Sequence, residues 1–194
     1  MRGATRFRIA ALIPIMLVAA CSSPNPALYT IAPVSGHPRV GGPRIVVLQT
    51  VSLARYLERS EIVRSSENYR LAVMSNDWWG ESLSAMLGRV LIEELGQRLP
   101  QATVLSGSGA VSVSPDATIE LDVQRLDEDI AGQLTLLAQA SVEFKGRGTP
   151  IVRSFRFTQA PPTPGTQGEV AAISAAVGQL ADGLASMLLT RSER

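Results

Sequence analysis

One thiol dominates the chemistry that this sequence could perform. Cys21 is the only cysteine, and it directly follows the residues Leu17-Val18-Ala19-Ala20. Ahead of it lie three arginines and an apolar run from Ile9 to Ala20. A basic start, an apolar middle and small residues before a cut site are typical of a secretory signal. The apolar run is too short for a transmembrane helix, which needs roughly 20 apolar residues.

A cysteine at the first position after the cut gives this thiol a specific role. Ala19 and Ala20 have the small side chains that signal peptidase requires, and the Cys21 sulfur is the nucleophile that accepts diacylglycerol. The alternative is a plain thiol behind an ordinary signal. We predict a lipoprotein signal peptide over residues 1–20 and a lipid anchor at Cys21. Ser22, in place of an aspartate, favours the periplasmic face of the outer membrane by the sorting logic of Gram-negative lipoproteins.

Other residues with catalytic or metal-binding potential are poorly placed for either role. The only histidine, His37, lies in a proline-rich stretch, so a Ser-His pair or a histidine metal site on the folded body is not expected. Ser108 lacks the flanking pattern of a nucleophile elbow. The acidic run 127–129 lacks the spacing and glycine of a calcium loop, and it is typical of a solvated hairpin end. We predict no catalytic residues, no metal, no cofactor and no enzymatic activity.

The charge of the chain argues against nucleic acid as a partner. Without the three signal-peptide arginines, basic residues fall from 18 to 15 against 17 acidic residues, a net charge of 15 − 17 = −2. A nearly neutral chain has no electrostatic footprint for nucleic acid. Attachment to a membrane must therefore come from acyl chains, which bind firmly when several are present.

Residues 21–43 contain five prolines and three glycines, a composition typical of a tether between the anchor and a folded body.

Residues 44–194 then predict a single α+β domain with a mostly antiparallel sheet and two long helices on one face. The first helix is expected from Asn76 or Asp77 to Pro100, with Trp79 in its buried stripe and Trp78 on the flank. The second carries an apolar stripe over 170–187. Apolar or alternating runs predict strands at 44–51, 62–63, 69–74, 103–105, 118–124, 134–144 and 151–158.

One polar segment is not explained by the packing of these elements. Arg55, Tyr56, Arg59 and Arg64 lie close together in the sequence, interleaved with glutamates. Such a run is usually a solvated face with weak local ion pairs. Because arginine and tyrosine are enriched in protein interfaces, the four residues are also a candidate partner-binding site.

The same segment carries a family resemblance. Residues 51–64 read Val-Ser-Leu-Ala-Arg-Tyr-Leu-Glu-Arg-Ser-Glu-Ile-Val-Arg. They are followed by Trp79-Gly80-Glu81-Ser82-Leu83 and preceded by Tyr29-Thr30-Ile31. This pattern resembles the ABC-type transport auxiliary lipoproteins of the PqiC type. Ala54 and Ser60 stand where that family has prolines, and the loss of both prolines loosens this turn-forming loop.

The resemblance implies a non-enzymatic adaptor. Such lipoproteins sit at the outer membrane, as homo-oligomeric rings in one arrangement, and meet periplasmic mammalian-cell-entry (MCE) domain proteins that are linked to an inner-membrane ABC-type or permease component. The implied cargo is phospholipid or another apolar substrate. A structural or assembly lipoprotein without lipid transport is the main alternative, and a monomeric lipid carrier is a third. A carrier needs an apolar cavity lined from both sides, and the polar, solvent-facing side of the alternating strands counts against it.

Overall fold

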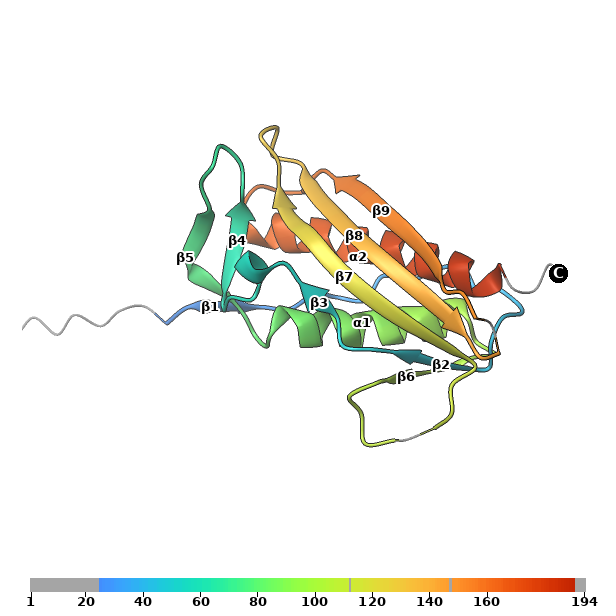
Figure 1. The fold of residues 1–194 in the computed structure, drawn as a ribbon. Coiled ribbons are helices and arrows are strands. Elements are labelled where there is room, and N and C mark those ends of the chain that lie inside the picture. Colours follow the sequence, from blue (N-terminus) through green and yellow to red (C-terminus); the bar gives the residue numbers. More distant parts are fainter. Residues whose placement is uncertain (1–24, 112, 147, 191–194) are drawn as a thin grey trace, which may run out of the picture.

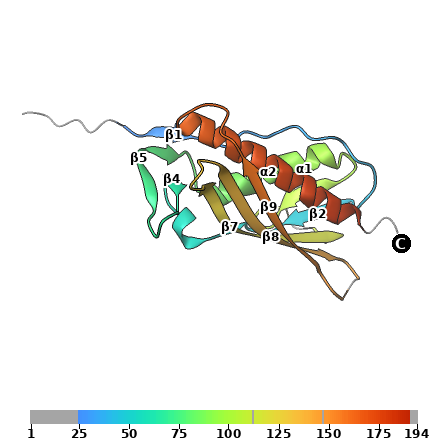
Figure 2. The same cartoon turned by 90° about the horizontal axis from the view of Figure 1, so that it is seen from above.

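The structure, a computed structural model, describes residues 25–111, 113–146 and 148–190 (Figure 1). The predicted signal peptide and Cys21 lie outside the described residues. The described part is a sheet with two helices, α1 (Leu83–Arg98) and α2 (Thr166–Leu189), both packed on one face of the sheet, as Figures 1 and 2 show. The predicted α+β class is confirmed. The strands are β1 (Ala27–Tyr29), β2 (Ile45–Leu48), β3 (Ser52–Leu53), β4 (Glu61–Ser65), β5 (Ala72–Trp79), β6 (Thr103–Ser106), β7 (Ala117–Glu128), β8 (Leu134–Phe144) and β9 (Ile151–Gln159).

The sheet is mixed, so the prediction of a mostly antiparallel sheet is wrong. One edge of the long strand β7 pairs in parallel with β2, β3 and β4 in turn. Strand β6 also runs parallel to β2, and β1 runs parallel to β5. The connection from β2–β4 to β7 passes through α1, and a crossover of this kind brings strands together in parallel. Sequence spacing shows only the short connections between β7, β8 and β9, which are indeed antiparallel.

Strands β7, β8 and β9 form the regular part of the sheet. Along β8, alternate residues from Leu134 to Phe144 are buried against the helices, as the alternation of the sequence predicts. A register shift between Val123 and Arg125 interrupts the pairing of β7 with β8. A bulge of this kind displaces the side chains that follow it. The bulge therefore sets the direction of the side chains that follow it, among them Arg125 and Asp127, whose contacts are described below.

Helix α1 begins at Leu83 after Ser82, six residues later than Asp77. Asn76, Asp77, Trp78 and Trp79 are instead the last residues of β5. The last three pair with β1, and Trp78 also pairs with β4. Trp79 is buried as expected, but on a strand. The helical stripe itself is confirmed, and burial of each such side chain contributes about 1.5–3 kcal/mol. Its buried members are Leu83, Met86, Leu87, Val90, Leu91 and Leu95.

Helix α2 is long and apolar enough to cross a membrane by length and composition alone. Two thirds of its most apolar window (67%) is nevertheless buried inside the body, which is typical of a core helix. Gly183 faces the ring of Phe155 so closely that a side chain at this position would collide with it. The apolar character of α2 therefore reflects its packing between the sheet and α1.

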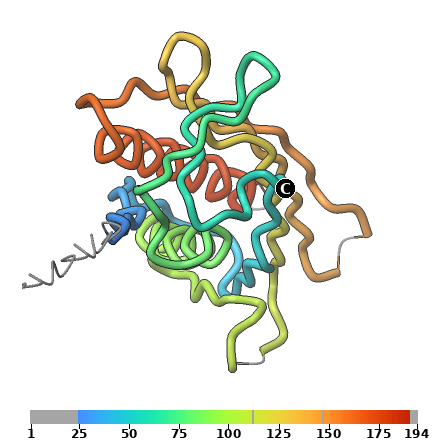
Figure 3. The backbone as a smooth tube through the Cα atoms, turned by 90° about the vertical axis from the view of Figure 1, so that its left-hand side faces the viewer, coloured from blue at the N-terminus to red at the C-terminus, as the bar shows by residue number. Residues whose placement is uncertain are grey.

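Residues 30–43, here called the N-terminal strap, lie along the two helices (Figure 3). The composition of this segment predicts a tether, and that prediction is not confirmed over the residues that the structure describes. Ile31 and Pro43 are buried, and Gly36 lies directly against the guanidinium of Arg98. The strap is therefore part of the packed body.

Candidate functional site

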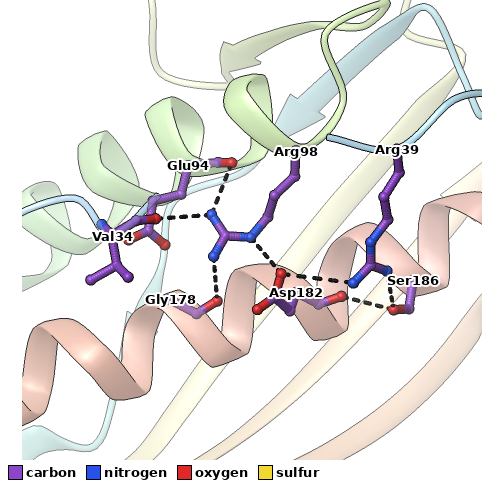
Figure 4. A network of polar contacts seen from close by, with 7 residues as sticks. All are labelled: Val34, Arg39, Glu94, Arg98, Gly178, Asp182 and Ser186. Atoms are coloured by element: carbon purple, nitrogen blue, oxygen red, sulfur yellow. Dashed lines mark hydrogen bonds and ion pairs between the residues drawn. The ribbon is translucent and has the colours of Figure 1, made fainter. Parts of the chain in front are cut away.

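Arg98, at the end of α1, joins the strap to both helices (Figure 4). Its side chain is only 1% exposed. The guanidinium donates hydrogen bonds to the carbonyls of Val34 (3.1 Å), Glu94 (3.2 Å) and Gly178 (2.9 Å). It also pairs with the Asp182 carboxylate at 2.7 Å. One buried cation thus holds strap, α1 and α2 together.

Glu94 completes this connection from α1. Its Oε1 accepts a hydrogen bond from the backbone N–H of Val34 at 2.7 Å, while Oε2 is buried and has no hydrogen-bond partner among the described residues. Burial raises the pKa of Glu94 to about 7, against the lowering effects of the Val34 amide and Arg98. A neutral Glu94 is therefore accessible near physiological pH.

The far end of the strap is fixed through Arg39. Its backbone N–H donates to the carbonyl of Arg98 at 2.7 Å, and its guanidinium donates to the Ser186 hydroxyl at 2.6 Å. Asp182 lies 3.7 Å from the same guanidinium (Figure 4). Because these bonds reach both helices, the strap cannot separate from the body without breaking polar contacts to α1 and α2.

A second polar cluster lies under the short 3-10 helix η1 (Arg55–Leu57). The hydroxyl of Tyr56 donates to the carboxylate of Asp127 at 2.7 Å, and Asp127 is fully buried. Burial raises the pKa of Tyr56 well above its usual value, and the hydrogen bond and the negative charge of Asp127 raise it further. Tyr56 is therefore a neutral donor that holds η1 against β7.

Arg125 neutralises the same carboxylate. Its Nε donates to Asp127 at 2.8 Å, and its other nitrogen pairs with Glu67 at 2.6 Å and donates to the carbonyl of Glu128. The cluster connects η1, the β4–β5 loop and the end of β7. Its polar groups pair with one another, an arrangement that fixes the shape of this surface and leaves no free nucleophile or base.

The structure does not gather the four predicted contact residues into one exposed cluster. Arg55 is exposed, and Arg59 pairs with the neighbouring Glu61 at 3.6 Å. Tyr56 points into the body, as described. Arg64, on β4, lies 3.8 Å from the carboxylate of Glu169 in the first turn of α2. Two of the four, Arg55 and Arg59, are thus available on the η1 turn itself.

Glu169 is the most unusual carboxylate of the described residues. It is fully buried, and neither of its carboxylate oxygens has a hydrogen-bond partner there. Burial raises its pKa to about 8, repulsion from Glu128, Asp127 and Asp77 adds to the rise, and Arg64 opposes it. Glu169 is therefore largely protonated at neutral pH, and Arg64 provides only partial compensation.

A groove of about 480 Å³ runs beside the exposed face of the η1 turn. Its walls are the turn after η1, which carries Glu58 and Arg59, and the β5–α1 connection around Gly80. It offers charged and polar groups at its rim and an apolar base formed by Leu53, Trp79 and Leu83. Such a surface suits the binding of a protein segment.

Most of these polar contacts have no signal in the sequence. The acidic run 127–129 reads as a solvated hairpin end, whereas Asp127 is buried by Tyr56 and the bulged end of β7. Glu94, Arg98 and Asp182 lie on the two helices, and no sequence motif marks them as partners of one another. An arginine that follows a glutamate by four residues, as Arg98 follows Glu94, is a signal only for a local helix pair. Among residues 25–111, 113–146 and 148–190, no group of three His, Cys, Asp or Glu side chains could hold a metal ion.

Comparison with known families gives one match. The family model described as "ABC-type transport auxiliary lipoprotein component" matches residues 28–185. Among proteins with curated descriptions, none matches the chain significantly.

Solved structures show the same fold. The chain is similar to an uncharacterized protein with a TM-score of 0.71 and 16% identity, covering 84% of this chain and 98% of the other. It is also similar to a Xanthomonas campestris protein of the family DUF330, with a TM-score of 0.69 and 17% identity over 86% of this chain and 98% of the other. A PelC dodecamer from Paraburkholderia phytofirmans matches with a TM-score of 0.46 and 10% identity over 80% of this chain and 96% of the other. At that distance its assembly says nothing about this chain.

Proposed function

The chain belongs to the family of ABC-type transport auxiliary lipoprotein components, and on that premise we propose that it is a non-enzymatic, outer-membrane-anchored adaptor of an MCE-type intermembrane lipid transport system. The match over residues 28–185 supports the auxiliary transport role in this proposal, because it includes most of β1, the strap, the other strands of the sheet and most of α2. The family unit is therefore nearly the whole described body.

In this proposal residues 1–20 are removed and Cys21 carries the acyl chains. Residues 21–43 connect it to the auxiliary domain 44–194 on the periplasmic face of the outer membrane, with β1 and the strap packed on that domain. The strap supports an adaptor role because it joins the chain that leaves the anchor to both helices through Arg98 and Arg39. These contacts hold the strap firmly on the body, which suits a protein that positions others from an anchor.

The η1 turn supplies the proposed contact with an MCE-domain protein, with a neighbouring copy in a ring, or with both. Arg59 lines the groove, and Arg55 is exposed on η1. The side chain of Arg64 on β4 is exposed to a similar degree, 45% against 41% for Arg59. Tyr56 takes a different role from the one its residue type suggests. Since its hydroxyl is bonded to Asp127, it positions the turn, and the arginines make the contact.

Arg59→Glu tests this contact. The reversed charge should abolish capture of the MCE-domain protein, or reduce the mass of the assembly in light scattering, while the melting temperature stays nearly unchanged. Arg153→Glu is the matched control, because Arg153 is an exposed arginine on β9. If both variants capture the partner and assemble like the wild type, the η1 turn is ordinary surface and the proposed contact is wrong.

Cys21→Ser tests the anchor. The variant should appear in the soluble periplasmic fraction with its fold intact, because the acyl chains are the proposed attachment. Retention of the variant in outer membranes would contradict the proposal that Cys21 is the anchor. The main alternative, a structural or assembly lipoprotein of the outer membrane, shares the anchor and differs in its partner and in lipid transport.

A further inference from the structure

The edge of the sheet that is nearest the predicted anchor presents two apolar side chains outward. Strand β1 runs along β5 with Leu28 directly beside Trp78, and Trp78 lies opposite Glu61 of β4. Leu28 is 68% exposed and Trp78 is 36% exposed, whereas the next residue of β5, Trp79, is turned into the core. Side chains of one row across a sheet share a face, so Leu28 and Trp78 form one apolar patch on the face away from the helices.

The chain itself limits how far this patch can be from an anchored membrane. Ala27, the first residue of β1, comes six residues after Cys21. Even fully extended, six residues span at most about 20 Å. With acyl chains on Cys21, which is part of the proposed function, the β1–β5 edge stays within that distance of the bilayer. Figure 1 shows β1 and β5 together at one end of the body.

The chemistry of the patch suits the boundary between lipid headgroups and acyl chains. Tryptophan is enriched there because its ring is apolar while its N–H needs a partner. The indole N–H of Trp78 already donates to the carbonyl of Ser75 at 3.1 Å, so it loses no hydrogen bond when water is removed. Glu61, which lies opposite Trp78 on β4, pairs with Arg59 at 3.6 Å, so these two charges offset each other. The patch therefore requires no anionic lipid.

We propose that Leu28 and Trp78 form a membrane-contact surface, which lays the β1–β5 edge against the phospholipid bilayer to which Cys21 is anchored. Two side chains bind too weakly to hold a free protein. The anchor keeps them at high local concentration beside the bilayer, so their contact becomes effectively intramolecular. The contact fixes the orientation of the body, with the opposite end of the sheet directed away from the membrane.

The test uses the sole cysteine. The chain from Cys21 onward, which contains every described residue, is coupled through that thiol to a maleimide lipid in phosphatidylethanolamine–phosphatidylglycerol vesicles. Because the anchor is installed chemically, the result does not depend on acylation in the cell, and a failure of the proposed function would leave it readable. Only two tryptophans are present, and Trp79 is buried. Quenching by brominated phospholipid therefore reports on Trp78.

We expect brominated lipid to quench the anchored wild type, and Trp78→Phe to lose most of that quenching. Leu28→Ser should weaken the quenching of Trp78. The matched control is Val152→Ser, an exposed apolar residue at the start of β9, and it should leave the quenching unchanged. Added salt should have little effect, since the patch carries no net charge.

Equal quenching of Trp78 by aqueous acrylamide in the anchored and free chains, with none from brominated lipid, would overturn the proposal. A second outcome would do the same. If protection of Trp78 appears only at high protein density on the vesicle, then the exposed edge of β1 contacts a second copy, and the membrane is not its partner.

Discussion

Replacement of Arg98 by methionine should release the strap and destabilise the body. The change keeps an unbranched apolar stem but removes the donors to the carbonyls of Val34 and Gly178 and to Asp182. Loss of one partner of a buried ion pair costs about 3–5 kcal/mol. Since the side chain of Asp182 is 44% exposed and can be hydrated, we expect the lower end, about 3 kcal/mol.

Arg89→Met is the matched control on the same helix. Arg89 pairs with Glu81 at the same distance, 2.7 Å, but the two side chains are 50% and 41% exposed. Its contact with the strap is a single hydrogen bond of 3.5 Å to the exposed Thr30, so its loss should cost less than about 1 kcal/mol. The two variants therefore separate burial from the mere presence of an ion pair.

Two measurements check this prediction. Urea unfolding gives the free energy of unfolding, and hydrogen exchange reports the strap directly through the amides of Val34 and Arg39, which donate to Glu94 and to the Arg98 carbonyl. In Arg98→Met both amides should exchange much faster than in the wild type. Unchanged exchange together with a stability loss no greater than that of Arg89→Met would refute the role of Arg98 in holding the strap.

Three further predictions follow from the buried groups. The raised pKa of Glu169 means that the folded state binds its proton more tightly than the unfolded state, whose value is near 4.5. The contribution of Glu169 to the free energy of unfolding is therefore fully present below about pH 4.5 and is lost as the pH rises to about 8. In Glu169→Gln, the urea midpoint should fall less steeply over this pH range than in the wild type. An unchanged dependence of the midpoint on pH would contradict this prediction. Trp79→Ala should cost about 3–5 kcal/mol in thermal or urea unfolding, and Trp78→Ala far less, because only Trp79 lies in the core. Tyr56→Phe should lower the free energy of unfolding by about 1.5–3 kcal/mol, because it removes a hydrogen bond to the Asp127 carboxylate. A urea midpoint equal to that of the wild type would show that this hydrogen bond does not stabilise the fold.

The elements that carry a regular hydrophobic period could be predicted from the sequence. Strand β8 begins and ends where the alternation from Leu134 to Phe144 does, and the α1 stripe from Leu83 to Leu95 is buried as its spacing indicates. A period reports which face of one element is buried. It does not report which strands become neighbours, so the parallel pairing of β7 with β2, β3 and β4 had no local signal.

The start of α1 shows a related limit. Asn76 and Asp77 are good helix-capping residue types, but the aromatic pair Trp78-Trp79 favours a strand, and pairing with β1 and β4 decides the outcome. Composition misleads in the strap for a similar reason. Its prolines and glycines indicate a tether, yet its backbone finds partners in Glu94, Ser174 and Arg98, which are distant in sequence.

The role of the η1 segment as a contact site stays a prediction, and its polar contacts had no local signal in the sequence. The sequence draws attention to Arg55, Tyr56 and Arg59 because packing does not explain them. It cannot show that the hydroxyl of Tyr56 meets Asp127, 71 residues away, since that contact depends on the bulge in β7 and on the fold of η1. The same applies to the contact of Arg64 with Glu169 across the body.

The central claim is that this chain serves lipid transport between membranes from a lipid anchor at Cys21. The most direct test measures the exchange of labelled phospholipid between the inner and outer membranes. It compares cells that express only the wild-type protein with cells that express only the Cys21→Ser variant. The account predicts slower exchange with Cys21→Ser, although the domain is folded and present in the periplasm. Exchange at the wild-type rate with Cys21→Ser, and also in cells that lack the chain, would contradict it.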